Sequence, residues 1–113
     1  MTNYTTGHDA EKLAADYLRA QGYKIVELNW HTRFCEIDIV AQKDATVYFT
    51  EVKYRKTTAF GSGLEYITSK KLKQMRFAAE MWVSQNRWSG DYQLAAIELT
   101  GPASTVTDFL TDL

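Results

Sequence analysis

Two acidic residues and a lysine occur where a β-hairpin would bring them together. Asp38 lies in one apolar segment and Glu51 and Lys53 in the next, with a polar turn between the two segments. If the turn centres on Asp44 and Ala45, Asp38 lies directly opposite Glu51, and opposed residues of an antiparallel pair project from the same face. Lys53 shares that face with Glu51, because side chains alternate along a strand. The spacing predicts two carboxylates and an ammonium group on one surface.

This grouping favours a metal site. Like charges opposed across a ladder repel, so protonation, exposure or a bound cation must relieve the Asp38–Glu51 pair. An all-oxygen site completed by water suits Mg²⁺ or Mn²⁺ better than zinc. Lys53 could hold a phosphate oxygen or help a water molecule attack, as metal-assisted phosphodiester hydrolysis requires. The alternative is a solvated strand edge with ordinary charges, because Asp followed thirteen residues later by Glu-x-Lys also arises by chance.

Charge is distributed unevenly along the chain. The formal net charge is -1, yet residues 51–76 contain seven basic and only two acidic residues. Such a stretch is a candidate contact surface for a polyanion such as nucleic acid, although a solvated basic helix face would look the same. Trp30 and Trp88 could stack on bases, but packing is the commoner role for tryptophan. The cationic side chains placed to hold phosphates are Arg55, Lys56, Lys70, Lys71 and Lys73.

Apolar periodicity predicts the elements that position these groups. A helix over about residues 7–21 would face inward with Ala10, Leu13, Ala14, Tyr17 and Leu18. Strands are expected over residues 23–29, 35–42, 46–54 and 91–99, a loop over 55–66, a second helix over 69–86 and a short tail over 101–113. The order αβββαβ predicts an α/β fold, with a mixed central sheet flanked by helices and a last strand that returns after a helical crossover.

The predicted faces of the hairpin and of the second helix differ in polarity. The charged hairpin face would carry Glu36, Asp38, Glu51 and Lys53, and the core face Cys35, Ile37, Ile39, Ala41, Tyr48 and Val52. On the second helix, an inward stripe would consist of Leu72, Met75, Ala79, Trp82 and Val83, and Lys70, Lys71 and Lys73 would face water.

Length and composition restrict the class of protein. With 113 residues, of which 45% are hydrophobic and 24% charged, the chain is expected to form one globular domain, residues 1–113. Cys35 is the only cysteine and cannot form an internal disulfide, which suits a reducing cytosol. No apolar run approaches the roughly 18 residues of a membrane span. We therefore expect a soluble cytoplasmic protein with no membrane association.

Four blocks of residues, in order and at fitting intervals, carry a resemblance to a known family. The blocks are Gly7, Glu11, Ala14, Tyr17, Leu18, Gly22 and Tyr23; Asn29, Arg33 and Glu36-Ile37-Asp38; Glu51-Val52-Lys53 with Arg55; and Phe60-Gly61, Lys71, Ala78-Ala79 and Trp82. Over about residues 7–99 the chain resembles the YraN family, small bacterial proteins classed as predicted endonucleases. Their fold is restriction-endonuclease-like and similar in core to archaeal Holliday-junction resolvases.

The resemblance implies an active site of the PD-(D/E)xK type. Asp38, Glu51 and Lys53 match its acidic and lysine positions, and the acidic residue of the first helix falls on Glu11. Glu11 also lies near the start of the predicted helix, where a negative charge complements the helix dipole, so a structural role is the alternative. Arg33 joins the nucleic-acid-binding candidates. The implied function is a Mg²⁺- or Mn²⁺-dependent endonuclease acting on DNA, with branched DNA as one candidate substrate.

Two other classes of function remain open. A nucleic-acid-binding module could keep the nuclease fold without cutting, and would show salt-sensitive DNA affinity but no metal-dependent product. An interaction protein could instead dock its basic helix on an acidic partner. A homodimer is also plausible for the nuclease, because two-fold junctions invite paired sites.

Overall fold

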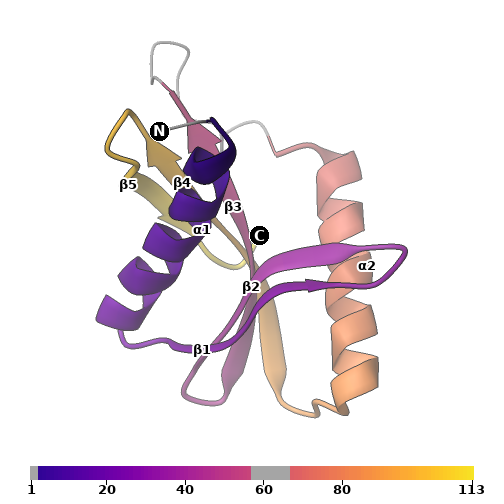
Figure 1. The fold of residues 1–113 in the computed structure, drawn as a ribbon. Helices are drawn as coiled ribbons and strands as arrows, with labels where there is room; N and C mark the ends of the chain where they lie inside the picture. Colours follow the sequence, from indigo (N-terminus) through magenta and orange to yellow (C-terminus); the bar gives the residue numbers. More distant parts are fainter. Residues whose placement is uncertain (1–2, 57–66) are drawn as a thin grey trace.

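The computed structural model describes residues 3–56 and 67–113, with side chains from Ala10 onward within these ranges. A five-stranded mixed sheet in the order β1-β2-β3-β4-β5 forms its centre (Figure 1). The elements are α1 (Asn3–Ala20), β1 (Lys24–His31), β2 (Glu36–Lys43), β3 (Thr46–Arg55), α2 (Ser69–Asn86), β4 (Asp91–Thr100) and β5 (Thr105–Leu110). β1, β2 and β3 are successively antiparallel, β4 runs parallel to β3, and β5 is antiparallel to β4. This confirms the α/β class with a mixed sheet, and the arrangement is consistent with a restriction-endonuclease-like fold.

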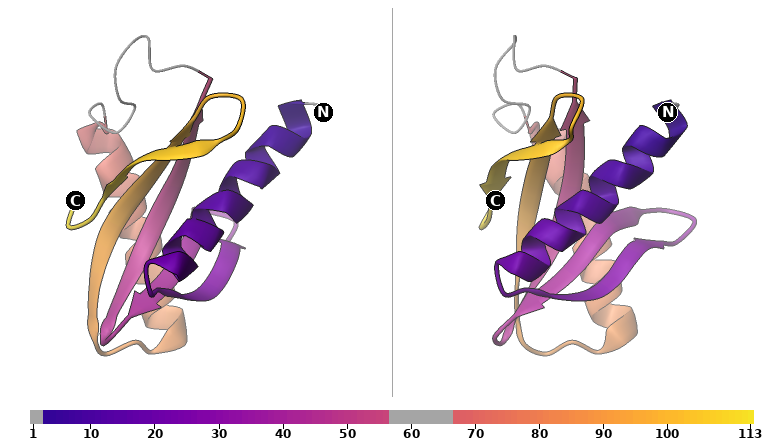
Figure 2. Two further views of the ribbon diagram at one scale, coloured as in Figure 1. Left: turned by 90° about the vertical axis from the view of Figure 1, so that its left-hand side faces the viewer. Right: turned by 60° about the vertical axis from the view of Figure 1, so that its left-hand side comes forward.

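The two helices cover opposite faces of the sheet (Figure 2). α1 packs with Ile39, Ala41, Ile97 and Leu99, whereas α2 packs with Val40, Val47, Phe49 and Leu94. Consecutive strand residues point to opposite faces, so a strand buried on both sides reads as a continuous apolar run. The sheet is therefore the middle layer of three.

α1 approaches the sheet closely through small side chains. Ala10, Ala14 and Leu18 are buried as predicted, but Leu13 is 38% exposed and Ala15 takes a buried position instead. The helix ends where Gly22 adopts φ +93°, with hydrogen bonds from the Tyr23 N–H to the Leu18 carbonyl and from the Gly22 N–H to the Arg19 carbonyl. This pair of bonds is a Schellman motif, whose left-handed residue is normally glycine.

The β2–β3 hairpin has the predicted register. Its pairs run from Lys43↔Thr46 to Ile39↔Thr50, with the turn at Asp44, which has φ 54°. Beyond Ile39 the described pairing of β2 with β3 ends, and the β1–β2 ribbon continues across α2 (Figure 1).

The prediction that Cys35 and Ile37 share a face with Ile39 is wrong, because this pairing ends. Cys35 and Ile37 pack with Val40 and α2, not with Ile39 on the α1 face. Because the start of β2 is released from β3, its twist carries these two side chains toward α2.

α2 has the predicted bounds and the predicted buried face. Ala78, Ala79 and Trp82 are buried, and Leu72, Met75 and Val83 pack against the same cluster. The tail contains a strand that was not predicted, β5, which extends the sheet beyond β4. Most of the expected 55–66 loop, including Phe60 and Gly61, lies outside the described residues. Among the helices that are described, none is long and apolar enough to cross a membrane.

Candidate active site

Asp38 and Glu51 lie where β2 separates from β3. Asp38 on β2 and Glu51 on β3 are each one residue beyond the last described pair, Ile39↔Thr50. Asp38 Oδ2 accepts a hydrogen bond of 2.8 Å from the backbone N–H of Val52. Val52 lies beyond the last β2–β3 pair, so the carboxylate supplies the acceptor that the β2 backbone no longer provides. This bond orients Asp38 beside Glu51.

The surroundings of Asp38 are strongly acidic. The pKa of Asp38 is raised from 3.8 to about 6, and burial is the largest cause. The Val52 N–H opposes this shift, whereas the charges of Glu51, Glu11 and Glu36 contribute to it. These groups come from β3, α1 and the start of β2, so three separate elements bring acidic side chains toward Asp38. A cation among them would favour the ionised form of Asp38.

Lys71 supplies a positive charge at this cluster. Its Nζ lies 2.9 Å from Glu51 Oε1, and the two side chains are 44% and 27% exposed. The prediction that Lys71 faces water was therefore only partly correct. The first turns of α2 run beside the charged end of β3, which brings this ammonium group to Glu51 while Lys70 and Lys73 remain exposed.

The donor set fits a hard divalent cation held by few protein ligands. No three acidic, histidine or cysteine side chains converge on a metal position within the described part of the chain. Asp38 and Glu51 would provide two carboxylate ligands, and Mg²⁺ characteristically keeps several waters in addition to one or two carboxylates. Asp38 Oδ1 accepts no hydrogen bond from the described residues, whereas Glu51 is paired with Lys71. An ion at this position would have to compete with Lys71 for Glu51.

A groove of about 910 Å³ extends from these acids between the β1–β2 ribbon and α2. Glu36, Asp38 and Glu51 are among its lining residues, and α2 contributes Lys70, Lys71 and Lys73. The groove therefore combines acidic side chains with a basic wall. That combination suits a phosphate backbone near a cation-binding site.

The other predicted site residues lie outside the walls of this groove. Lys53 follows Glu51 on β3, is exposed, and pairs in register with Glu98 of β4. Arg55 and Lys56 are at the far end of β3, and Arg33 is at the tip of the β1–β2 ribbon. Glu11 reaches the site from α1 through its electrostatic effect on Asp38.

Two groove residues, Phe34 and Phe77, were missed by sequence reasoning. The sequence contained a signal for each of them. Phe34 is an aromatic residue within the turn of residues 32–35, and Phe77 lies on α2 outside its predicted inward stripe. Trp30 and Trp88, which were considered for base stacking, instead pack against the core cluster on the α2 face.

Comparison with known proteins identifies relatives along most of the chain. Residues 10–99 match the model of the Uncharacterised protein family UPF0102. A UPF0102 protein from Vibrio parahaemolyticus is 40% identical over 95 residues, which cover 82% of this chain and 78% of that protein. A UPF0102 protein from Syntrophomonas wolfei is 46% identical over 81 residues, which cover 72% and 70% of the two chains. One from Herpetosiphon aurantiacus is 36% identical over 99 residues, covering 83% and 80%. The chain therefore belongs to the UPF0102 family.

Proposed function

We propose that this protein is a metal-dependent endonuclease of the YraN type that hydrolyses phosphodiester bonds in DNA. The observation that carries the proposal is the proximity of Asp38 and Glu51, from neighbouring strands, in a groove that three lysines of α2 also line. An acidic residue on one strand and Glu-x-Lys on the next is also the order of the PD-(D/E)xK motif, to which the sequence shows resemblance.

The side chains have distinct roles in this proposal. Asp38 and Glu51 bind Mg²⁺ or Mn²⁺, with Glu11 adding negative charge from α1. An ion held by these carboxylates would supply positive charge against the attacked phosphate. The Val52 N–H keeps the Asp38 carboxylate oriented. Lys53 lies outside the groove walls but on the same side of β3 as Glu51, and its role in the proposal is to stabilise the charge that develops on the phosphate.

The lysines of α2 hold the substrate. Lys71 pairs with Glu51, and it would be released to contact a phosphate if a cation took that carboxylate. Lys70 and Lys73 hold flanking phosphates, and contacts of this kind position a backbone without reading its bases.

The direct test is DNA cleavage. Purified protein is incubated with linear and with branched DNA in Mg²⁺, Mn²⁺ or EDTA. We expect products only with a divalent ion, and none from Glu51→Gln. Glu80→Gln, which removes an exposed acid of α2 outside the groove, should cut like the wild type. Cleavage that persists in Glu51→Gln contradicts the assignment of the site.

The Lys71–Glu51 ion pair favours one alternative, a DNA-binding module that keeps this fold without cutting. In that case the lysine is the permanent partner of the carboxylate, and no ion is needed. DNA affinity would fall steeply with salt while no divalent ion yields a product.

A further inference from the structure

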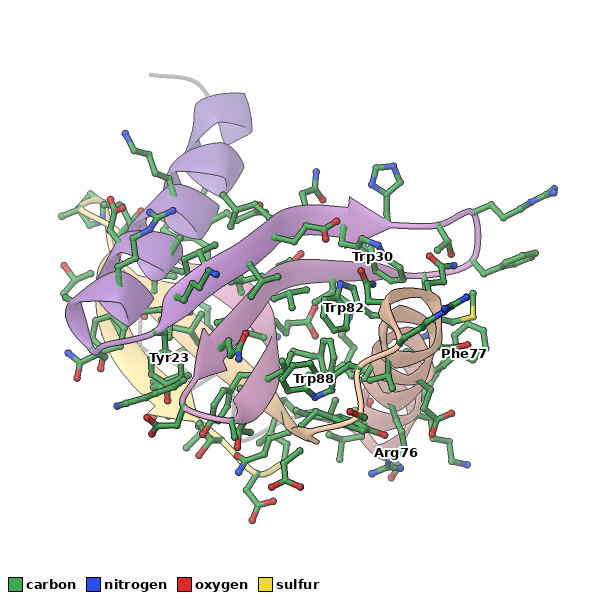
Figure 3. All side chains as sticks on the ribbon, turned by 90° about the horizontal axis from the view of Figure 1, so that it is seen from below. Tyr23, Trp30, Arg76, Phe77, Trp82 and Trp88 are labelled. Carbon is green, nitrogen blue, oxygen red and sulfur yellow. The ribbon has the colours of Figure 1, made fainter. Side chains whose placement is uncertain are left out.

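The two most exposed large apolar side chains among the described residues border the same groove. Phe34 is 72% exposed and Phe77 is 47% exposed, and the next is Leu28 at 44%. Phe34 is at the tip of the β1–β2 ribbon and Phe77 is on α2. Figure 3 shows Phe77 on the flank of α2 beneath the ribbon, whereas Arg76 points away from it. Two exposed aromatic rings from different elements thus line the same groove.

Local hydrogen bonds hold Phe34 in its exposed position. The Thr32 N–H donates to the Cys35 carbonyl at 2.8 Å, and the Phe34 N–H donates to Thr32 Oγ1 at 3.0 Å. The Arg33 guanidinium lies 5.4 Å from the centre of the Phe34 ring. The turn therefore presents an aromatic face together with a cation.

Phe77 lies in line with two lysines on the surface of α2. Residues three or four apart are neighbours on a helix surface, so Lys70, Lys73 and Phe77 form one row. Phe77 is six residues beyond Lys71, or about 9 Å along the helix axis. A ligand that follows this row from Glu51 meets ammonium groups first and then an aromatic ring.

We propose that this groove holds an unpaired segment of DNA, with its bases stacked on Phe34 and Phe77 and its phosphates on Lys70 and Lys73. The inference rests on the proposed function and specifies its substrate, which is DNA with unpaired bases at the cleavage site. Aromatic rings beside a positively charged track are the usual platform for single strands. Bases inside a duplex are already stacked on both faces, so the two rings are unable to reach them unless the strand is open.

The experiment measures binding without cleavage. Fluorescence anisotropy in EDTA compares a single-stranded oligodeoxynucleotide with a blunt duplex of the same length. We expect Phe34→Ala and Phe77→Ala each to weaken single-strand binding by roughly 5- to 150-fold, the range for loss of one stacked base, and to change duplex binding by less than about twofold. Leu28→Ala, a comparably exposed apolar residue outside the groove, is the matched control.

A second readout tests stacking itself. An oligonucleotide containing 2-aminopurine should lose fluorescence on binding to the wild type and to Phe34→Trp, which keeps an aromatic face, and should lose less with Phe34→Ala. Because Phe34 is mostly exposed, these variants keep the core intact.

Several outcomes would overturn the inference. Unchanged single-strand binding in both alanine variants, or equal losses on the duplex, would remove the stacking role. If light scattering showed a dimer that Phe34→Ala dissociates, the rings would be an interface between copies of the chain. The proposed function can fail separately from this inference. Metal-dependent cleavage that is unchanged in both phenylalanine variants contradicts only the inference. Single-strand binding that depends on the two rings, without any cleavage, supports the inference and contradicts the nuclease function.

Discussion

At the scale of single residues, Asp38 is ionised at neutral pH in surroundings that oppose its charge. Partial burial and three neighbouring acids favour its protonated state, with a pKa of about 6 against 3.8 in an exposed chain. A difference of this size corresponds to about 3 kcal/mol of folding free energy at neutral pH. The folded protein therefore holds an ionised carboxylate at a cost, as expected where a ligand replaces the proton.

Removing this charge should stabilise the protein in a pH-dependent way. The pKa of Asp38 is about 6 in the folded state and 3.8 in the unfolded state. The proton on Asp38 therefore contributes fully to the free energy of unfolding below about pH 3.8, and this contribution is lost as the pH rises through 6. Asp38→Asn keeps an oxygen for the Val52 N–H. By urea unfolding we expect Asp38→Asn to exceed the wild type by about 1–3 kcal/mol at pH 7 and to match it near pH 4. An equal difference at both pH values contradicts the interpretation.

A divalent ion should relieve the same repulsion. At an ion concentration about 100 times the dissociation constant, binding to the folded state adds roughly 2.7 kcal/mol of stability. We expect Mn²⁺ to raise the thermal midpoint of the wild type by several degrees and to leave Asp38→Asn and Glu51→Gln nearly unchanged. Glu80→Gln is the control and should respond like the wild type. An equal response in all four proteins would locate the ion elsewhere.

Lys71 should have opposite effects on the affinity of the proposed site for Mn²⁺ and for DNA. As a partly exposed pair, Lys71–Glu51 adds little to stability, so Lys71→Gln should fold normally. Without the competing ammonium group, Mn²⁺ should bind more tightly, whereas DNA should bind several-fold more weakly because one phosphate contact is lost. Calorimetry with Mn²⁺ and anisotropy with DNA measure the two effects. Lys24→Gln, which removes an exposed lysine at the start of β1, should change neither.

At the scale of elements, the structure explains which predictions from the sequence succeeded. The α2 bounds and the hairpin register were correct, because helical periodicity and a two-residue turn are local signals. β5 was missed because Val106 and Phe109 are three residues apart, which breaks strand alternation. The register shift opposite Glu98 and Leu99 brings both side chains to the α1 face.

The site was predicted to the extent that it depends on the hairpin. Placing Asp38 beside Glu51 requires only the turn, whereas the Lys71–Glu51 pair depends on how α2 crosses the sheet. The misplacement of Ile37 has a similar origin, since alternation along β2 is a valid guide only while the strand remains paired with β3. Contacts between distant elements leave no periodic signal in the sequence.

The N-terminus of α2 positions the groove lysines and can be tested by its cap. The Thr68 side chain accepts a hydrogen bond of 3.1 Å from the backbone N–H of Lys71. Thr68→Ala should lower the free energy of unfolding by about 1 kcal/mol and speed amide exchange at Lys71, because an N-cap satisfies a free donor of the first turn. Thr68→Ser keeps the oxygen and should lose much less. Equal losses in the two variants would indicate that the methyl group, not the cap, is responsible.

At the scale of the whole molecule, the proposed binding of DNA depends on the separation of charge along the chain. The net charge of -1 gives no general attraction to DNA, so binding must depend on the local row of lysines along α2. α2 lies on the face of the sheet opposite α1 (Figure 2). Lys70 and Lys73 of this helix line the same groove as Asp38 and Glu51.

The salt dependence of DNA binding should separate this charge from the aromatic contacts. Each phosphate contact released changes the slope of log affinity against log salt by about one, so the double variant Lys70→Gln and Lys73→Gln should reduce the slope by one to two. Phe34→Ala should weaken single-strand binding at every salt concentration without changing the slope, because stacking releases no counterions. Titrations between about 50 and 200 mM salt resolve the two effects. A reduced slope in Phe34→Ala would mean that Phe34 acts by positioning the Arg33 guanidinium over its ring, and the base-stacking role would have to be abandoned.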